Sequence, residues 1–370
     1  MRVIMTGGGT GGHIYPAIAI ADEIKDRDKE TQILFVGAQK GLEKTLVPKR
    51  GYPIELLTLE GFDRKNIVRN IGVIRKLMKG NARAREIIKT FRPDFVVGTG
   101  GYASAPVVKM AQKEGVPTYI HEQNAVPGVT NKLLEKHVRK IFLGFEKASE
   151  HFRNKDKQIV TGNPVRGEFL NATREESRRE LGFAEDDFVL LAFGGSQGAG
   201  KINKAMLSVI SEFNSDEKFK ICLGTGSYYN KAILSELSEN GIELGDNVVV
   251  MEFIDDMASY LAAADLVISR SGALTVAEVA VSGAPTIFIP SPIVTDNHQY
   301  YNAMALAEKG GAFVFEEKNL EDKGRLIEAI KNLRNNPEML KTMSEKSRAS
   351  GLREATKVIC DTILEDYADE

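Results

Sequence analysis

Thr6-Gly7-Gly8-Gly9-Thr10-Gly11-Gly12-His13 is the stretch that decides the fold of this chain. It follows a short apolar run at residues 3–5 and precedes a helical pattern at residues 16–27. The order of strand, glycine turn and helix is typical of a parallel α/β sheet, and glycine lets a phosphate or a sugar approach the backbone closely. His13 is one of five histidines and ends the turn, so the turn also offers a candidate acid or base.

Outward from this turn, short apolar segments alternate with helical patterns through the first half of the chain. The predicted strands are residues 2–6, 32–36, 95–98, 118–121, 140–143 and 158–160. The predicted helices are residues 16–27, 67–92 and 105–114. Such alternation predicts a parallel sheet that is covered by helices on both faces.

The second half begins again with an apolar segment, residues 188–193, and a second glycine turn at residues 194–199. Further strands are predicted at residues 220–223, 248–251, 266–269, 286–289 and 312–314, with helices from about residue 202 and at 275–282. The expected class is therefore α/β, with two Rossmann-like, doubly wound parallel-sheet domains that face each other across a cleft. Glycine and proline at residues 162–164 mark the join.

Composition limits the classes of function. The chain has 370 residues, of which 42% are hydrophobic, and a net charge of −2, so two full cores are expected and general nucleic-acid binding is not. Cys222 and Cys360 lie too far apart in sequence for a metal motif, which fits a reducing compartment. We expect neither a signal peptide nor a membrane-spanning segment.

The first turn has three alternative interpretations. Gly7, Gly9 and Gly12 fit the G-x-G-x-x-G dinucleotide pattern, which requires an acidic residue after the second strand. Residues 37–40 (Gly-Ala-Gln-Lys) contain no acid, so a nicotinamide cofactor is disfavoured. A turn without any ligand is also disfavoured, because three adjacent glycines carry a large entropic cost. The third interpretation, close approach of another ligand to the backbone, is therefore favoured.

Two segments of the second half are candidates for a nucleotide site. In residues 194–199, Ser196 and Gly198 stand where a helix begins, a place suited to phosphate. In residues 270–278, a Ser-Gly turn precedes a helix whose first amides can bind phosphate, and Glu278 can accept two ribose hydroxyls. The alternative for Glu278 is a favourable interaction with the helix N-terminus alone.

Six motifs occur in one order along nearly the whole chain: residues 8–13, 121–124, 162–166, 194–199, 252–257 and 270–278. Together they resemble the MurG family of hexosyltransferases (glycosyltransferase family 28). The resemblance implies transfer of N-acetylglucosamine from UDP-N-acetylglucosamine to lipid I, undecaprenyl-pyrophosphoryl-MurNAc-pentapeptide, giving lipid II for peptidoglycan synthesis. It also implies a GT-B fold with domains 1–163 and 164–347, and a C-terminal helix, 348–370, that crosses back to the first domain.

The resemblance also implies site residues. The Ile254 backbone would read uracil, Glu278 would hold the ribose, and Gln299 would bind sugar hydroxyls. The implied donor-binding set is Thr10, Gly11, Gly12, Asn124, Arg166, Ser196, Ile254, Ala273, Leu274, Thr275, Val276, Ala277, Glu278 and Gln299.

The implied reaction inverts the donor anomeric centre, so a single in-line displacement suffices. His13 is the candidate general base, and its alternative role is to orient substrate only. No Asp-x-Asp pair lies in a glycine loop, and Asp255-Asp256 fits a turn, so neither a catalytic metal nor a cofactor is expected. His121, at a strand end, is either a site residue or a structural histidine.

Residues 64–92 hold ten Lys or Arg and one acid, Glu86. Ile67, Ile71, Ile74 and Met78 recur at helical spacing, which favours a helix that binds an anionic membrane surface. The alternative is a solvated helix whose apolar stripe faces the core. Nucleic acid is disfavoured, since no aromatic residue interleaves before Phe91. The expected location is peripheral, at the cytoplasmic face of the cell membrane, with cell-wall synthesis and division proteins as further partners.

Three rival functions remain open at this point. They are a sugar-nucleotide epimerase, a transferase with another acceptor, and a sugar-nucleotide sensor without catalysis. An epimerase needs further acid and base carboxylates near the sugar, and none stands out in the sequence.

Overall fold

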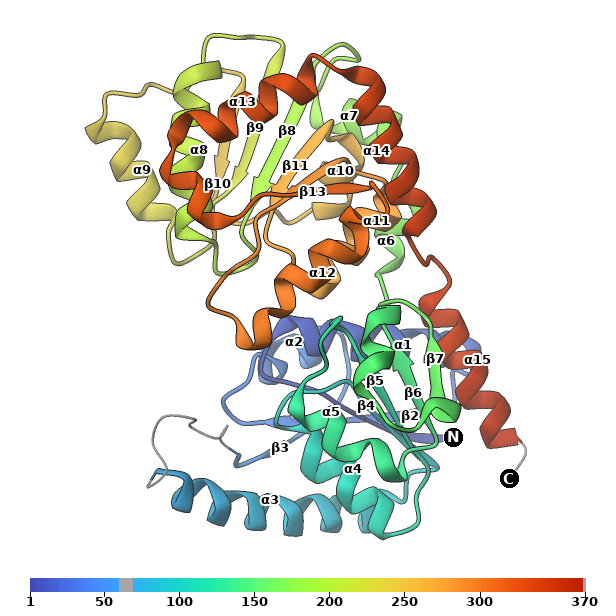
Figure 1. Cartoon of the computed structure of the whole chain (residues 1–370). Coiled ribbons are helices and arrows are strands. Elements are labelled where there is room, and N and C mark those ends of the chain that lie inside the picture. Colours follow the sequence, from blue (N-terminus) through green and yellow to red (C-terminus); the bar gives the residue numbers. More distant parts are fainter. Residues whose placement is uncertain (60–68, 369–370) are drawn as a thin grey trace. The chain divides into compact units, whose positions relative to one another are not determined.

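The computed structural model describes residues 1–59 and 69–368. The chain divides into two compact units, Met1–Val165 with Arg353–Glu370, and Arg166–Leu352. Each unit is built on one all-parallel sheet with helices packed against it (Figure 1). The predicted α/β class with two Rossmann-like sheets is confirmed.

The sheet of the first unit has seven strands within its described residues, in the order β3-β2-β1-β4-β5-β6-β7. Their bounds are β1 Arg2–Thr6, β2 Gln32–Ala38, β3 Ile54–Leu57, β4 Phe95–Gly98, β5 Thr118–Glu122, β6 Lys140–Leu143 and β7 Gln158–Val160. Strand β3 was not predicted. Only Leu57 of its four residues is buried, because β3 lies at the sheet edge, so its sequence lacks a continuous buried run.

Strand β1 shows how the sheet separates two cores. Val3 and Met5 pack on one face with residues of α1 and α15, whereas Ile4 packs on the other face with residues of α3 and α4. The helices of this unit are α1 Gly11–Arg27, α2 Glu43–Lys49, α3 Arg69–Phe91, α4 Ser104–Lys113, α5 Val129–Leu134 and α15 Ala355–Ala368.

Helix α1 begins five residues earlier than predicted, at Gly11 rather than Pro16. Thr10 is the extended N-cap, so Gly11, Gly12 and His13 form the first helical turn. Proline marked the predicted start because its ring disfavours helix interiors, but here it follows a full turn. His13 is therefore a helical residue with a defined orientation.

Helix α15 belongs to the first unit, although it ends the chain. Ile359, Cys360 and Ile363 are fully buried against α1, and Arg27 pairs with Asp361 (Figure 1). The chain leaves the second unit after α14 (Pro337–Ser350), so residue 347, the expected domain end, lies inside a helix.

The second unit has a six-stranded sheet in the order β10-β9-β8-β11-β12-β13, and all of its residues are described. The strands are β8 Phe188–Phe193, β9 Phe219–Gly224, β10 Val248–Met251, β11 Leu266–Ser269, β12 Thr286–Phe288 and β13 Ala312–Val314. The helices are α6 Gly167–Asn171, α7 Arg174–Leu181, α8 Gly200–Phe213, α9 Asn230–Glu239, α10 Met257–Ala263, α11 Ala273–Ser282, α12 His298–Ala307, α13 Lys323–Arg334 and α14. Helices α8 and α11 begin two residues before the predicted starts, within their turns.

Candidate functional site

The glycine turn of the first unit is interlocked with a second turn that follows β4. Gly8 N–H donates to Gly100 O (3.4 Å), and a Cβ on Gly101 would overlap the Gly8 carbonyl. Gly9, Gly100 and Gly101 all have positive φ, which favours glycine at each position. The shape of the two turns is thus set by backbone contact between them.

A buried carboxylate, Glu43, fills the space behind the glycine turn. Its Oε2 accepts from Gly9 N–H (2.9 Å) and its Oε1 from Ala38 N–H (2.8 Å), while only 1% of the residue is exposed. A Cβ on Gly8, Gly37 or Gly41 would overlap this side chain. Several glycines here therefore make room for the protein's own carboxylate.

Residues 37–40 contain no acid, but Glu43 lies shortly after them in the sequence and reaches the glycine turn. The carboxylate comes from the first position of α2, five residues beyond the end of β2. Its oxygens are occupied by loop amides, so it shapes the turn instead of presenting itself to a ribose. An acid at a helix start directly after a glycine-rich turn was the available signal in the sequence.

His13 is held in one orientation by the same turn. Its Nδ1 lies 3.2 Å from Gly8 O and 3.3 Å from Thr10 Oγ1. A carbonyl oxygen only accepts, so the Gly8 contact places the proton on Nδ1 and leaves the lone pair on Nε2. Thr99 Oγ1 also donates to the His13 carbonyl (2.7 Å), which ties the first turn of α1 to β4. This tautomer is the one that a general base at Nε2 requires.

Asn124 is positioned by Glu122, the last residue of β5. The Glu122 Oε1 accepts from Asn124 N–H (3.0 Å) and from Asn124 Nδ2 (3.3 Å). Its Oε2 accepts from Asn131 Nδ2 (2.8 Å) and Gly128 N–H (3.1 Å). With 2% exposure, Glu122 fixes the loop that carries Asn124 and does not itself face solvent.

Of the two alternatives for His121, a site residue or a structural histidine, its contacts favour the structural one. Its Nε2–H donates to Gly162 O (3.2 Å), and its Nδ1 accepts from Gln123 Nε2 (2.9 Å). Burial lowers its pKa to about 4, so the ring stays neutral near pH 7. Both nitrogens are engaged within the core of the unit.

The glycine turn of the second unit, residues 194–199, is exposed to solvent, whereas Glu43 fills the space behind the first turn. Gly195 and Gly198 have positive φ, and a Cβ on Gly198 would overlap the Thr225 carbonyl. Ser196 and Gln197 are exposed, and α8 begins at Gly200. This turn presents a hydroxyl and backbone to solvent beside a helix N-terminus.

Helix α11 presents a second N-terminus in the same unit. Gly272 is its N-cap, and its first turn contains no acidic residue and no side-chain cap. The first amides of a helix have no acceptor within the helix, so those of Ala273, Leu274 and Thr275 point outward from its end. Val276 and Ala277, also in the expected donor set, continue the helix to Glu278.

Glu278 and Arg166 lie at ion-pair distance from each other in this unit. Arg166 Nη2 lies 4.0 Å from Glu278 Oε1, and its Nη1 lies 2.6 Å from Glu168 Oε1. Burial raises the pKa of Glu278 to about 7, and the nearby Arg166 charge offsets this only in part. The Glu278 side chain as a whole is 18% exposed.

Gln299 and Ile254 are positioned by contacts within the second unit. Gln299 Oε1 accepts from Ser291 N–H (2.8 Å), and its backbone oxygen accepts from Ser271 Oγ (2.8 Å). Ile254, 4% exposed, packs its side chain over Gly224 at the end of β9. Arg270, in contrast, donates to Ile289 O (2.9 Å) and pairs with Glu317, which assigns it to the scaffold.

Apart from Arg166, which is the N-cap of α6, the predicted residues follow carboxyl strand ends within each unit. In the first unit they follow β1 and β5, which both flank β4. In the second unit Ser196 follows β8, Ile254 follows β10, residues 273–278 follow β11 and Gln299 follows β12. Ligands of open parallel sheets bind at such ends.

Family models match both halves of the chain. The glycosyltransferase family 28 N-terminal domain matches residues 3–143, and the family 28 C-terminal domain matches residues 189–359. The fold and these matches define a glycosyltransferase of family 28.

Relatives then specify the family more closely. A protein of Desulforamulus reducens named UDP-N-acetylglucosamine–N-acetylmuramyl-(pentapeptide) pyrophosphoryl-undecaprenol N-acetylglucosamine transferase is 45% identical and covers 96% of both chains. A Clostridioides difficile protein of the same name is 41% identical over 99% of this chain and 89% of its own. The crystal structure of Acinetobacter baumannii MurG superposes with a TM-score of 0.77 at 28% identity, over 98% of this chain and 99% of that chain. This chain belongs to the MurG family.

A likeness to an epimerase shows only the shared fold. The UDP-GlcNAc 2-epimerase of Neisseria meningitidis has a TM-score of 0.68 but 16% identity, over 99% of this chain. The epimerase alternative therefore gains no support beyond architecture.

Proposed function

We propose that this chain transfers N-acetylglucosamine from UDP-N-acetylglucosamine to the 4-hydroxyl of N-acetylmuramic acid in lipid I and so forms lipid II. The whole-length similarity to transferases of that name carries the reaction. The residues that perform it are inferred from the geometry of each unit.

His13 is the proposed general base. The acceptor hydroxyl attacks C1 of the donor sugar, the bond from C1 to the diphosphate oxygen breaks, and the hydroxyl proton passes to His13 Nε2. The Nδ1–H to Gly8 contact supports this role, because it fixes the tautomer and stabilises the imidazolium that forms. Thr10, Gly11, Gly12 and Asn124 are proposed to line the transferred sugar.

The second unit is proposed to hold the nucleotide. Ser196 and the first amides of α11 would meet the diphosphate, and Arg166 would offset the charge that grows on the leaving UDP. Glu278 would accept from both ribose hydroxyls, the Ile254 backbone would meet uracil, and Gln299 would meet the sugar. No step in this scheme uses a metal or a cofactor.

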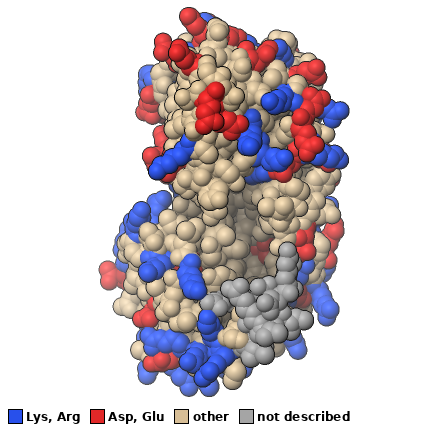
Figure 2. Space-filling view, turned by 90° about the vertical axis from the view of Figure 1, so that its left-hand side faces the viewer, with Lys and Arg blue, Asp and Glu red and all other residues tan. Residues whose placement is uncertain are grey.

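Helix α3 is proposed to bind an anionic membrane surface at the cytoplasmic face. Figure 2 shows Lys and Arg side chains gathered at the lower end of the first unit, where α3 lies in Figure 1. Arg83 pairs with Glu55 and Glu86, but Arg75 and Lys79 have no ion-pair partner among the residues that the structure describes. These two cations are therefore available to lipid headgroups.

The apolar residues of α3 divide between the core and solvent. Val73 and Ile88 are buried in the first unit, whereas Met78, a residue of the predicted stripe, is 68% exposed. Residues 60–68, including Ile67, and the side chains of Ile71 and Ile74 lie outside the described part of the chain. None of the described helices is both long and apolar enough to span a bilayer.

Acceptor-dependent release of UDP tests the proposed reaction. We expect UDP from UDP-N-acetylglucosamine only when a lipid I analogue is present, together with a β-linked disaccharide product. Binding of the donor without any UDP release would instead identify a sensor. Release without an acceptor product would identify a hydrolase.

A further inference from the structure

The segment that leads into helix α12 has an unusual backbone conformation. Asp296 and Asn297 have φ angles of 53° and 51°, and Arg92 is the only other non-glycine residue of the described chain with a positive φ. Asparagine and aspartate usually adopt this left-handed conformation singly, and strained backbone of this kind gathers at functional sites. Two such residues in succession therefore mark the start of α12 as a candidate for function.

The first residue of α12, His298, has one ring nitrogen engaged and the other unpaired. Its Nδ1 lies 2.8 Å from the carbonyl oxygen of Thr295. A carbonyl oxygen only accepts, so Nδ1 carries the proton and Nε2 keeps a lone pair. No residue within the described ranges hydrogen-bonds to Nε2, and His298 is only partly buried. The strained turn thus presents an unpaired hydrogen-bond acceptor.

Hydrogen bonds hold this end of α12 beside the start of α11. Ser271, in the turn before α11, donates from Oγ to Gln299 O (2.8 Å), and its carbonyl oxygen accepts from Asn302 Nδ2 (3.3 Å). Ser271 is fully buried, so the link between the two helix starts is internal. His298 precedes Gln299 in the same helical turn. It is therefore close to the helix start at which the donor diphosphate is proposed to bind.

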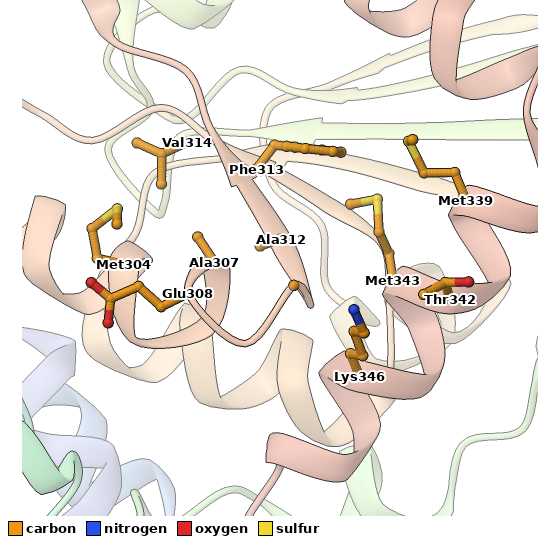
Figure 3. Close-up of a pocket in the computed structure, with 11 residues that line it drawn as sticks. Met304, Ala307, Glu308, Ala312, Phe313, Val314, Met339, Thr342, Met343 and Lys346 are labelled. Carbon is orange, nitrogen blue, oxygen red and sulfur yellow. The ribbon is translucent and has the colours of Figure 1, made fainter.

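The opposite end of α12 has a different character (Figure 3). There Met304 and Glu308 line a cavity of about 420 Å³, together with Phe313 of β13 and Met339 of α14. Thioether, aromatic and aliphatic side chains make up most of the wall of this cavity, and they offer few hydrogen bonds to a sugar. Of the two ends of α12, the first turn is therefore the one suited to a sugar.

We infer that His298 Nε2 accepts a hydrogen bond from a hydroxyl of the transferred sugar. This inference rests on the proposed function, which places the sugar beyond the diphosphate at the start of α11. Gln299 Oε1 is already occupied by Ser291 N–H (2.8 Å), so the Gln299 side chain offers the sugar its Nε2–H donors. His298 supplies an acceptor beside those donors, and a sugar hydroxyl both donates and accepts. Together the two side chains would fix the orientation of the sugar.

Two substitutions separate this role from a structural one, because asparagine and glutamine replace different nitrogens of histidine. In His298→Asn the amide N–H can take the place of Nδ1–H, which keeps the contact with Thr295 but leaves no acceptor at the position of Nε2. In His298→Gln the longer side chain brings its amide oxygen to the position of Nε2 and gives up the contact with Thr295. The two variants therefore test the two ring nitrogens one at a time.

Titration calorimetry of the full chain with UDP-N-acetylglucosamine and with UDP tests the inference. We expect His298→Asn to bind UDP-N-acetylglucosamine about three- to tenfold more weakly than wild type, which corresponds to the loss of one neutral hydrogen bond. Its affinity for UDP, which lacks the sugar, should equal that of wild type. His298→Gln should bind both ligands as wild type does. Glu308→Gln, at the opposite end of α12, is the control and should also match wild type.

The inference is overturned if His298→Asn binds UDP-N-acetylglucosamine at least as tightly as His298→Gln does, because Nε2 would then contribute nothing to binding. It is also overturned if His298→Asn weakens the binding of UDP and of UDP-N-acetylglucosamine equally, since the contact would then not be to the sugar. A wild-type chain that binds neither ligand would overturn the proposed function, and this inference with it.

Discussion

The two glycine turns share one plan, strand then glycine then helix, yet the protein completes them in opposite ways. In the first unit a buried carboxylate, Glu43, occupies Gly9 N–H, and His13 stands in the first turn of the helix. In the second unit Ser196 is exposed, and the nearby helix α11 has no acid in its first turn. An amide of the first turn is thus paired with the protein's own carboxylate, whereas the helices that begin at the second turn and at Ala273 have no acidic residue in their first turns. Similar local sequence therefore need not imply similar ligands.

Loss of the His13 imidazole should give the largest effect. We expect His13→Ala to lower turnover by roughly 10²–10⁴-fold, the usual contribution of a general base. Affinity for UDP-N-acetylglucosamine should change little, because the proposed nucleotide contacts lie in the other unit. Steady-state UDP release and donor titration calorimetry measure the two quantities, and His137→Ala, an exposed histidine, is the control. Turnover close to wild type would remove His13 from the role of base.

Substitution of Glu278 should weaken the nucleotide site and remove its pH response. The carboxylate accepts two hydroxyls best when ionised, so donor affinity should increase as pH rises through about 7. Glu278→Gln should bind the donor about 10–100-fold more weakly at pH 8, since hydrogen bonds to charged groups are worth about 1.5–3 kcal/mol. Its affinity should also be flat with pH. Calorimetry with UDP-N-acetylglucosamine at pH 6 and pH 8 tests this, with the exposed Glu328→Gln as control.

The same carboxylate predicts a change in stability with pH. The pKa of Glu278 is higher in the folded than in the unfolded chain, so the folded state binds more protons between pH 4.5 and about 7. Its contribution therefore lowers the free energy of unfolding as pH rises through that window. Glu278→Gln should gain stability relative to wild type at pH 8 but not at pH 4. A difference that is equal at both pH values would contradict the shifted pKa.

Glu43→Gln tests whether the first turn depends on its internal anion. The amide would place an N–H group against an N–H donor of the loop, at a cost of about 1–3 kcal/mol in the free energy of unfolding. The apparent KM for a lipid I analogue should rise severalfold, while donor affinity stays unchanged. Denaturant unfolding and initial rates measure these effects, and the exposed Glu30→Gln is the matched control. Equal losses of donor and acceptor affinity would point to general unfolding.

The smallest effect on turnover should come from the surface of α3. Arg75→Glu with Lys79→Glu should reduce binding to vesicles that contain anionic lipid, by about 1 kcal/mol for each cation removed at low salt. Turnover with a water-soluble acceptor should be unaffected. Flotation at two salt concentrations checks this, with Lys231→Glu and Lys323→Glu in the second unit as controls. Membrane binding that is independent of both salt concentration and anionic lipid content would contradict the proposal that α3 binds membranes through its charges.

The sequence by itself determined the two α/β halves, nearly all strands and the two glycine turns. These features depend on local patterns: apolar runs of strand length, helical periodicity, and glycine where backbone must come close. Strand β3 was not predicted, because an edge strand buries too few side chains to produce such a pattern.

Only the tertiary structure decided what occupies the first turn. Glu43 reaches Gly9 across 34 positions of sequence, Gly162 holds the neutral ring of His121, and Gly8 fixes the tautomer of His13. Burial and long-range hydrogen bonds set the charge and orientation of a side chain, and neither follows from the residues beside it in the chain. The glycine turn was recognisable as a candidate site from the sequence. That the Glu43 carboxylate packs against it was evident only from the fold.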